Sequence, residues 1–187
     1  MADINRDFFF AQARKTLFSG KFTQSQVDGI NSILDSWEAT YSDQDDRWLA
    51  YALATTFHET AMTMQPIEEY GHGRGRPYGI PDPVTGQTYY GRGFVQLTWK
   101  RNYATMAEKI GADLVNHPEL ALNLDYATKI MYVGMIEGLF TGKALKDYFN
   151  SNTEDWVGAR RIINGQERAQ EIAQYGHKFY AAIAGPQ

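Results

Sequence analysis

Apolar residues recur at helical spacing along much of the chain, and the first two such stretches lie near its beginning. We expect one helix from Phe8 to Phe18 and a second from Thr23 to Trp37. The second stretch opens with Thr23 and Gln26, which have the spacing of a capping box. Its main apolar residues fall on one face: Val27, Ile30, Ile33, Leu34 and Trp37. Both helices are therefore expected to cover a hydrophobic core.

A third apolar stretch starts at Trp48 and reads WLAYALATTFHET. Several of its residues share one helical face: Leu49, Ala52, Leu53, Thr56, Phe57 and Thr60. The preceding Asp43, Asp45 and Asp46 favour a helix start, because a carboxylate caps free N–H groups and is attracted to the positive end of the helix. Glu59 falls near the end of this predicted helix, on the flank of its apolar face. It is therefore expected to be neither fully buried nor fully solvated.

The helical pattern breaks after this stretch. Residues 65–88 are rich in Gly, Pro and Tyr, and a turn is expected from Asp82 to Gly86. Polar and apolar residues then alternate from Phe94 to Thr98, which predicts a short strand or hairpin arm. A long irregular stretch in a compact domain is usually functional. We therefore expect residues 65–88 to contribute to a binding or catalytic site.

The second half of the chain returns to helical patterns. We expect helices over Trp99–Ile110, Asp125–Phe140, Thr153–Ile163 and Gln166–Ala184, the first of them ended by Gly111. No repeat, linker or low-complexity segment divides the chain. About seven helices around a small β element predict a single, mainly helical α+β domain over residues 1–187.

Composition narrows the class of protein. With 187 residues, 43% of them hydrophobic, the chain can bury its own core. It has no cysteine, which excludes a disulfide scaffold, a thiol nucleophile and thiolate metal sites. A net charge of −4 argues against a non-specific nucleic-acid binder. The start of the chain lacks the pattern of a signal peptide, and no apolar run predicts a membrane span, so we expect a protein that begins in the cytoplasm without stable membrane association.

Two carboxylates carry the candidate chemistry. Glu59 and Glu68 stand nine positions apart, the first at a helix end and the second in the irregular stretch. One half-buried and one solvated carboxylate suit the roles of general acid and general base, although both are also common as ordinary surface residues. A zinc-protease helix is excluded, because Met62 stands where the second metal-binding His would be. Glu69 is a rival for Glu68, since a slip of one residue would exchange them.

Three motifs occur in a fixed order. They are HET at residues 58–60 with an acid nine positions after its Glu, then YYGRGFVQLTWKRNY at residues 89–103, then RRIING at residues 160–165. Together they resemble the family 19 glycoside hydrolases, which comprise plant-type chitinases and related phage and bacterial endolysins. The resemblance covers roughly residues 45–180. It implies a lysozyme-like fold and inverting hydrolysis of β-1,4 bonds between N-acetylated amino sugars, with no metal or cofactor.

The resemblance also implies a role for individual residues. Glu59 is similar in position to the general acid, Glu68 to the general base, and Thr98 to the hydroxyl that helps to hold the attacking water. Five further residues would bind the sugar or support the cleft: Tyr90, Arg92, Gln96, Asn102 and Asn164. Without the resemblance, each of these five would be interpreted as a residue that serves packing or a turn.

The chain departs from the family pattern in ways that favour the endolysin branch. The usual HETGG becomes HETAM, the spacing between the two acids is shorter than in the plant chitinases, and cysteine is absent. We therefore expect bacterial peptidoglycan as the substrate, with a chitinase of the same chemistry or a non-catalytic cell-wall binding protein as alternatives. The endolysin resemblance further implies a monomer that reaches the wall when a separate membrane-permeabilising protein acts.

Overall fold

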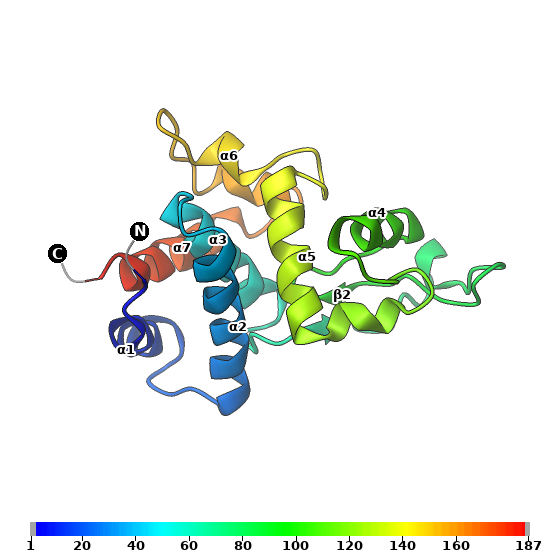
Figure 1. Cartoon of the computed structure of the whole chain (residues 1–187), viewed down its shortest axis with the longest axis horizontal. Coiled ribbons are helices and arrows are strands. Elements are labelled where there is room, and N and C mark those ends of the chain that lie inside the picture. Colours follow the sequence, from blue (N-terminus) through cyan, green and yellow to red (C-terminus); the bar gives the residue numbers. More distant parts are fainter. Residues whose placement is uncertain (1–2, 186–187) are drawn as a thin grey trace.

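Seven α-helices and one two-stranded sheet form the part of the chain that the computed structural model describes, residues 3–185 (Figure 1). The helices are α1 (Arg6–Leu17), α2 (Gln24–Thr40), α3 (Asp46–Glu59), α4 (Lys100–Ile110), α5 (Leu124–Glu137), α6 (Leu145–Tyr148) and α7 (Ala169–Ala184). Strand β1 (Ile67–Glu68) pairs antiparallel with β2 (Arg92–Gly93). Short 3₁₀ turns cover Pro77–Gly79, Pro118–Leu122 and Gly158–Ile162. The expected mainly helical α+β fold is confirmed.

Helix α3 forms the centre of the hydrophobic core. Every residue from Leu49 to Phe57 is buried, so the helix has no solvent-facing side along most of its length. Helices α2, α5 and α7 all contact α3, and α1 packs against α7 (Figure 1). The expectation of a single apolar face was too narrow, because small residues such as Ala50 and Ala54 let neighbouring helices approach the other faces. This burial fixes the position of Glu59, the last residue of α3.

The helix starts follow the sequence closely. In the capping box of α2, the Gln26 N–H donates to Thr23 Oγ1 at 3.1 Å, and the Thr23 N–H donates to Gln26 Oε1 at 2.9 Å. At the start of α3, Asp45 accepts from the Arg47 N–H at 2.9 Å. Caps of this kind contribute about 1 kcal/mol each. They help to set where α2 and α3 begin.

The strand predicted over Phe94–Thr98 is not present. Strand β2 covers Arg92–Gly93, and the chain then turns so that Leu97 bridges back to Arg92. The reason is the backbone of Gln96, whose φ of 58° is left-handed and ends any extended run. Residues 94–98 therefore form a tight turn rather than a hairpin arm.

The helix predicted over Thr153–Ile163 is also wrong. Glu154 bridges to Phe149, and the Asp155 carboxylate accepts from the Gly158 N–H at 2.8 Å, so this stretch begins as a bridge and a turn. The helical part is the 3₁₀ turn Gly158–Ile162. A short polar side chain that bonds to a nearby backbone N–H competes with helix formation in this way.

Three predicted helices have clearly different ends in the structure, and one of them, α2, continues past Trp37 to Thr40. Helix α5 stops at Glu137, because Gly138 adopts a left-handed φ of 71°, and so it does not reach Phe140. The chain folds back, and the Phe140 ring lies directly over Gly134. The last helix, α7, starts at Ala169 and not at Gln166. No helix within residues 3–185 is long and apolar enough to cross a membrane.

Candidate functional site

A cleft of about 620 Å³ lies at the end of α3. Its walls come from α3, the loop before β2, the turn after β2, the start of α4, and the segments after α5 and before α7. The residues that line it are Glu59, Arg76, Tyr78, Val95, Gln96, Leu97, Thr98, Trp99, Asn102, Phe140, Ile163 and Asn164. Five of the eight predicted site residues are in this set: Glu59, Gln96, Thr98, Asn102 and Asn164.

Glu59 enters the cleft as an ion-paired carboxylate. Its side chain is 17% exposed, and Oε1 accepts a hydrogen bond from Arg160 Nη1 at 2.8 Å. Arg160 is 5% exposed, and its Nε donates to the Glu167 carbonyl at 3.2 Å. A guanidinium buried to this degree needs a charged partner, because an unpaired buried charge is strongly unfavourable. Oε2 of Glu59 makes no hydrogen bond to another described residue, so one oxygen remains available to a ligand.

A strained turn presents the polar side chains of the opposite wall. The Gln96 amide donates to the Ile67 carbonyl at 2.9 Å and ties the turn to β1. Thr98 Oγ1 donates to the Gln96 carbonyl, and the Asn102 amide donates to the Thr98 carbonyl, both at 2.8 Å. The φ values of Gln96 and Trp99, 58° and 77°, are rare for residues other than glycine and typically cost about 1 to 3 kcal/mol each. Strain of this kind is common at functional sites, where the surrounding hydrogen bonds hold it in place.

Glu68, Tyr90 and Arg92 lie together in a second cluster, and none of the three lines the cleft. The Tyr90 hydroxyl donates to Glu68 Oε2 at 2.5 Å, and His72 Nε2 lies 3.2 Å from the same oxygen. The Arg92 guanidinium lies 3.7 Å from the centre of the Tyr90 ring and donates to the Tyr103 hydroxyl at 3.0 Å. Burial and, next, the bond to Glu68 raise the pKa of Tyr90. Arg92 is only 6% exposed, and its contacts with Tyr90 and Tyr103 show that it supports the structure of this cluster.

Glu69 follows β1 and points elsewhere. Its Oε1 accepts a hydrogen bond from the Tyr78 hydroxyl at 2.6 Å, and Tyr78 is one of the cleft residues. This hydrogen bond is the main cause of the raised pKa of Tyr78. The Tyr78 ring also packs edge-on against Trp99, with ring centres 5.0 Å apart. Glu69 is thus linked directly to the wall of the cleft.

The segment after Glu59 carries further strain. Ala61 and Met62 have φ values of 49° and 71°, in the left-handed region where glycine is favoured. These are the two positions at which the HETGG pattern has glycine. Ala61 and Met62 therefore adopt a backbone conformation that glycine would adopt with less strain.

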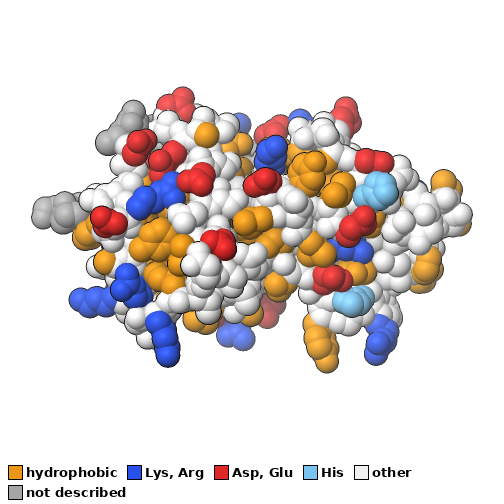
Figure 2. All heavy atoms as spheres, turned by 60° about the horizontal axis from the view of Figure 1, so that its bottom comes forward, with side chains coloured by type: hydrophobic (Ala, Val, Ile, Leu, Met, Phe, Trp, Pro, Cys, Tyr) orange, Lys and Arg blue, Asp and Glu red, His pale blue; other side chains and the backbone are white. Residues whose placement is uncertain are grey.

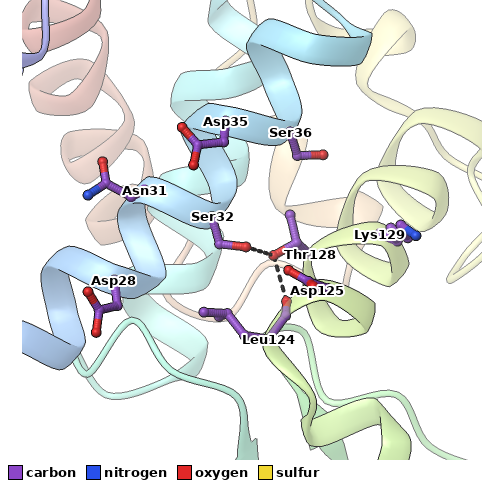
Figure 3. A pocket seen from close by; sticks show the side chains of 9 residues that line it. All are labelled: Asp28, Asn31, Ser32, Asp35, Ser36, Leu124, Asp125, Thr128 and Lys129. Carbon is purple, nitrogen blue, oxygen red and sulfur yellow. Dashed lines mark hydrogen bonds between the residues drawn. The ribbon is translucent and has the colours of Figure 1, made fainter.

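A second hollow, of about 540 Å³, lies between α2 and α5 (Figure 3). Ser32 and Thr128 face each other across it and form a hydrogen bond of 2.8 Å. Its acidic residues are Asp28, Asp35 and Asp125, of which Asp35 is paired with Arg6 at 2.7 Å. None of the predicted site residues lines this hollow. Within residues 3–185 there is also no group of three or more acidic or His side chains that could hold a metal ion.

Comparison with known proteins agrees with the motifs. A family model described as "Chitinase class I" matches residues 42–132. The acidic endochitinase SP2 of Beta vulgaris is 37% identical over 150 residues, which is 75% of this chain and 50% of that protein. The chain belongs to family 19 of the glycoside hydrolases.

Other similar proteins share shorter stretches of sequence. Chitinase 3 of Oryza sativa subsp. japonica is 35% identical over 99 residues, 44% of this chain and 31% of the relative. An inactive chitinase-like protein 1 of Hevea brasiliensis is 49% identical over 47 residues, 23% of this chain and 15% of the relative. The chain spans half or less of the length of these relatives.

Solved structures extend the likeness to the whole fold. The crystal structure of a bacterial family 19 chitinase matches with a TM-score of 0.60 over 99% of this chain and 97% of that one, at 19% identity. Chitinase C from Streptomyces griseus HUT6037 matches with a TM-score of 0.58 over 98% of this chain and 79% of that one, at 20% identity. At these identities the likeness shows the fold alone.

Tyr78 and Phe140 line the cleft, and Arg160 contacts Glu59; none of the three was identified from the sequence. Arg160 stands within the RRIING motif, which could have indicated it. Its partner Glu59 is 101 positions away, so no local pattern shows the ion pair. Phe140 has no such signal, because its place in the cleft depends on the end of α5 at Gly138.

Proposed function

We propose that this protein is a glycoside hydrolase that cleaves β-1,4 bonds of bacterial peptidoglycan by an inverting mechanism. The observation that carries the proposal is the cleft itself, in which the family's acid position, Glu59, faces a set of amide and hydroxyl side chains. Gln96, Thr98 and Asn102 offer hydrogen bonds suited to sugar hydroxyl and acetamido groups. Tyr78 and Trp99 offer aromatic surface on which a sugar ring can pack.

The proposed reaction uses two carboxylates. In its protonated form, Glu59 donates its proton to the leaving glycosidic oxygen while a water attacks C1 from the opposite face of the sugar. A second carboxylate, from the pair Glu68 and Glu69, takes a proton from that water, and Thr98 helps to hold it. An inverting site leaves about 6.5 to 9.5 Å between the two carboxyl groups to make room for the water. After proton transfer Glu59 is negatively charged, and Arg160 is placed to stabilise that charge.

Charge supports peptidoglycan over chitin. Chitin is neutral, whereas peptidoglycan carries carboxylates on its stem peptides. Arg76 lies in the wall of the cleft and could pair with such a carboxylate. The absence of cysteine and the short segment between Glu59 and Glu68 support the same branch of the family. A chitinase is the second candidate, because two of the relatives named above are chitinases.

The test compares the two polymers. Purified peptidoglycan and chitin oligomers are incubated with the wild type, and the products are analysed by mass spectrometry. The proposal expects muropeptides with ordinary reducing ends, faster cleavage of peptidoglycan than of chitin, and loss of turnover in Glu59→Gln. Anhydro ends would indicate a lytic transglycosylase instead. Wall binding without turnover by the wild type would indicate a non-catalytic binding protein. Glu119→Gln, an exposed carboxylate remote from the cleft in sequence, is the matched control.

We also propose that the protein acts as a monomer and reaches the wall from the cytoplasm through a separate membrane-permeabilising protein. Support comes from the resemblance to the endolysin branch. Expression in a bacterial host should leave cells intact until such a protein is co-expressed. Lysis by this chain alone would contradict the proposed route, and a dimer in sedimentation would contradict the monomer.

A further inference from the structure

A further hollow, of about 280 Å³, adjoins the cleft. It is lined by most residues of the segment 77–83 and by Tyr89, Trp99 and Lys100, and we call it the side groove. Tyr78 and Trp99 line both the side groove and the cleft, and their rings pack edge-on with centres 5.0 Å apart. A branch of a substrate bound in the cleft therefore needs to pass only this aromatic pair to reach the side groove.

The polar groups of the side groove are already paired. Lys100 Nζ donates to Asp82 Oδ2 at 3.0 Å, and Asp82 Oδ1 accepts from the Thr85 N–H at 2.9 Å. The Tyr89 hydroxyl donates to the Val115 carbonyl at 2.7 Å. The rest of the lining consists mainly of proline, isoleucine and aromatic rings. Sugar hydroxyls that leave water need hydrogen-bond partners, so the side groove suits an apolar ligand, in contrast to the amide and hydroxyl side chains of the cleft.

The loop beside the side groove exposes apolar side chains. Four large hydrophobic side chains are exposed within residues 3–185, and two of them are Ile80, at 69%, and Val84, at 85%. The loop over residues 77–86 projects at the right of Figure 1, and within it Ile80 lines the side groove whereas Val84 does not. Prolines at positions 77, 81 and 83 restrict the backbone around Ile80. A restricted loop loses little freedom on binding, so an apolar ligand that covers Ile80 gains affinity at low entropic cost.

A cation stands where the side groove meets the cleft. Arg76 lines the cleft, and the next residue, Pro77, lines the side groove. The Arg76 guanidinium makes no ion pair with another residue in the described part of the chain. A carboxylate on the ligand would pair with it. The site therefore fits a short chain that carries both apolar groups and a carboxylate.

From these features we propose that the side groove binds the stem peptide of peptidoglycan while the sugar chain lies in the cleft. The alanine methyl groups of the peptide pack against Ile80 and the neighbouring prolines, and one peptide carboxylate pairs with Arg76. Chitin has no peptide branch and leaves the side groove empty. The inference rests on the proposed function and adds the part of the substrate that is recognised outside the cleft. Ile80 is then a specificity-determining residue that takes no part in the chemical step.

The test compares soluble glycan strands that carry stem peptides with the same strands after an amidase has removed the peptides. The wild type should cleave the peptide-bearing strands with a kcat/KM at least about fivefold higher, a modest gain for covering one aliphatic side chain. Ile80→Ser should lose most of this preference through a higher KM on peptide-bearing strands, while its kcat/KM on peptide-free strands stays within about twofold of the wild type.

Val84→Ser is the matched control, because Val84 is an exposed aliphatic residue of the same loop that lies outside the side groove. It should keep wild-type kinetics on both substrates. Both variants should keep the melting temperature of the wild type, since both side chains are exposed. Two kinetic results would overturn the inference. One is a wild type that cleaves both forms equally; the other is an Ile80→Ser variant that loses the same factor on both, which would show that the side groove holds sugar.

Binding gives a readout that needs no turnover. The Ile80 methyl signals in NMR should shift on titration with a disaccharide that carries a stem peptide, and should stay in place with the peptide-free disaccharide. Shifts with both ligands, or with neither, would equally overturn the inference. A wild type that cleaves neither form of strand contradicts the proposed function instead, and the titration still decides what the side groove binds.

Discussion

Replacing Gly134 with alanine tests how α5 shapes the cleft. A Cβ atom at Gly134 would lie 2.1 Å from Cζ and 2.3 Å from Cε2 of Phe140, so the ring has to move away. Overpacking of this kind costs about 1 to 3 kcal/mol. Alanine in a helix interior gains at most about 1 kcal/mol over glycine. We therefore expect Gly134→Ala to lower the free energy of unfolding by about 1 kcal/mol and to raise KM, because Phe140 leaves the cleft wall.

A double-mutant cycle isolates the contact between these two residues. When Phe140→Ala has removed the ring, Gly134→Ala no longer meets an obstacle and should stabilise the protein through helix propensity alone. Urea unfolding of the wild type, both single variants and the double variant should give a coupling free energy of at least about 1 kcal/mol. The reasoning is refuted if Gly134→Ala has the same effect on stability with and without the Phe140 ring, or if it leaves KM unchanged.

Three further predictions concern the ion pair, the strained segment and the loop beside the cleft. Arg160→Met should lower the free energy of unfolding, measured in urea, by about 3 kcal/mol. This value is at the low end for a broken buried ion pair, because the Glu59 side chain is 17% exposed. A change under about 1 kcal/mol would contradict the prediction. Met62→Gly should raise the melting temperature, because glycine relieves the strain of the left-handed φ, and this gain outweighs the added entropy of the unfolded chain. Little packing is lost, since Met62 is already 43% exposed. Met62→Ala is the control and should not raise the melting temperature. Hydrogen bonds from the Thr85 N–H and, next, from Lys100 lower the pKa of Asp82 from 3.8 to about 2. The ionised Asp82 therefore contributes fully to folding stability above pH 3.8, and this contribution is lost as the pH falls toward 2. Asp82→Asn should therefore lower stability at pH 7 but not at pH 2, and an equal loss at both pH values would count against the ionic contribution.

The face of the molecule in Figure 2 offers little guidance to the site. Figure 2 shows acidic and basic side chains on the same face, with hydrophobic side chains between them. In this view basic side chains gather at the lower left, and acidic side chains are more frequent above them. The identification depends on the cleft and its residues instead.

The central helix and its carboxylate could be predicted from the sequence, because α3 is defined by local features. An apolar run of good helix formers follows capping aspartates, so the end of α3 and the place of Glu59 follow from the pattern alone. The same holds for the capping box of α2. The polar residues around Thr98 were identified through the family motif, and the structure places three of them in the cleft with Glu59.

The remaining features depend on tertiary structure. The alternation in residues 94–98 indicates a strand, but the left-handed backbone at Gln96 is imposed by hydrogen bonds to β1 and to Gly93. The face on which Glu68 or Glu69 emerges depends on the register between β1 and β2, and a shift of one residue exchanges them. Neither the register nor the pairing of Arg160 with Glu59 leaves a trace in local sequence.

The configuration of the first product tests the central claim of a two-carboxylate inverting hydrolase most directly. Proton NMR of a soluble β-1,4-linked oligosaccharide, recorded within the first minutes of cleavage and before mutarotation, distinguishes the two anomers of the new reducing end. The account predicts the α-anomer as the initial product, with no signal above background from Glu59→Gln. An initial β-anomer, or turnover by Glu59→Gln near that of the wild type, would contradict it.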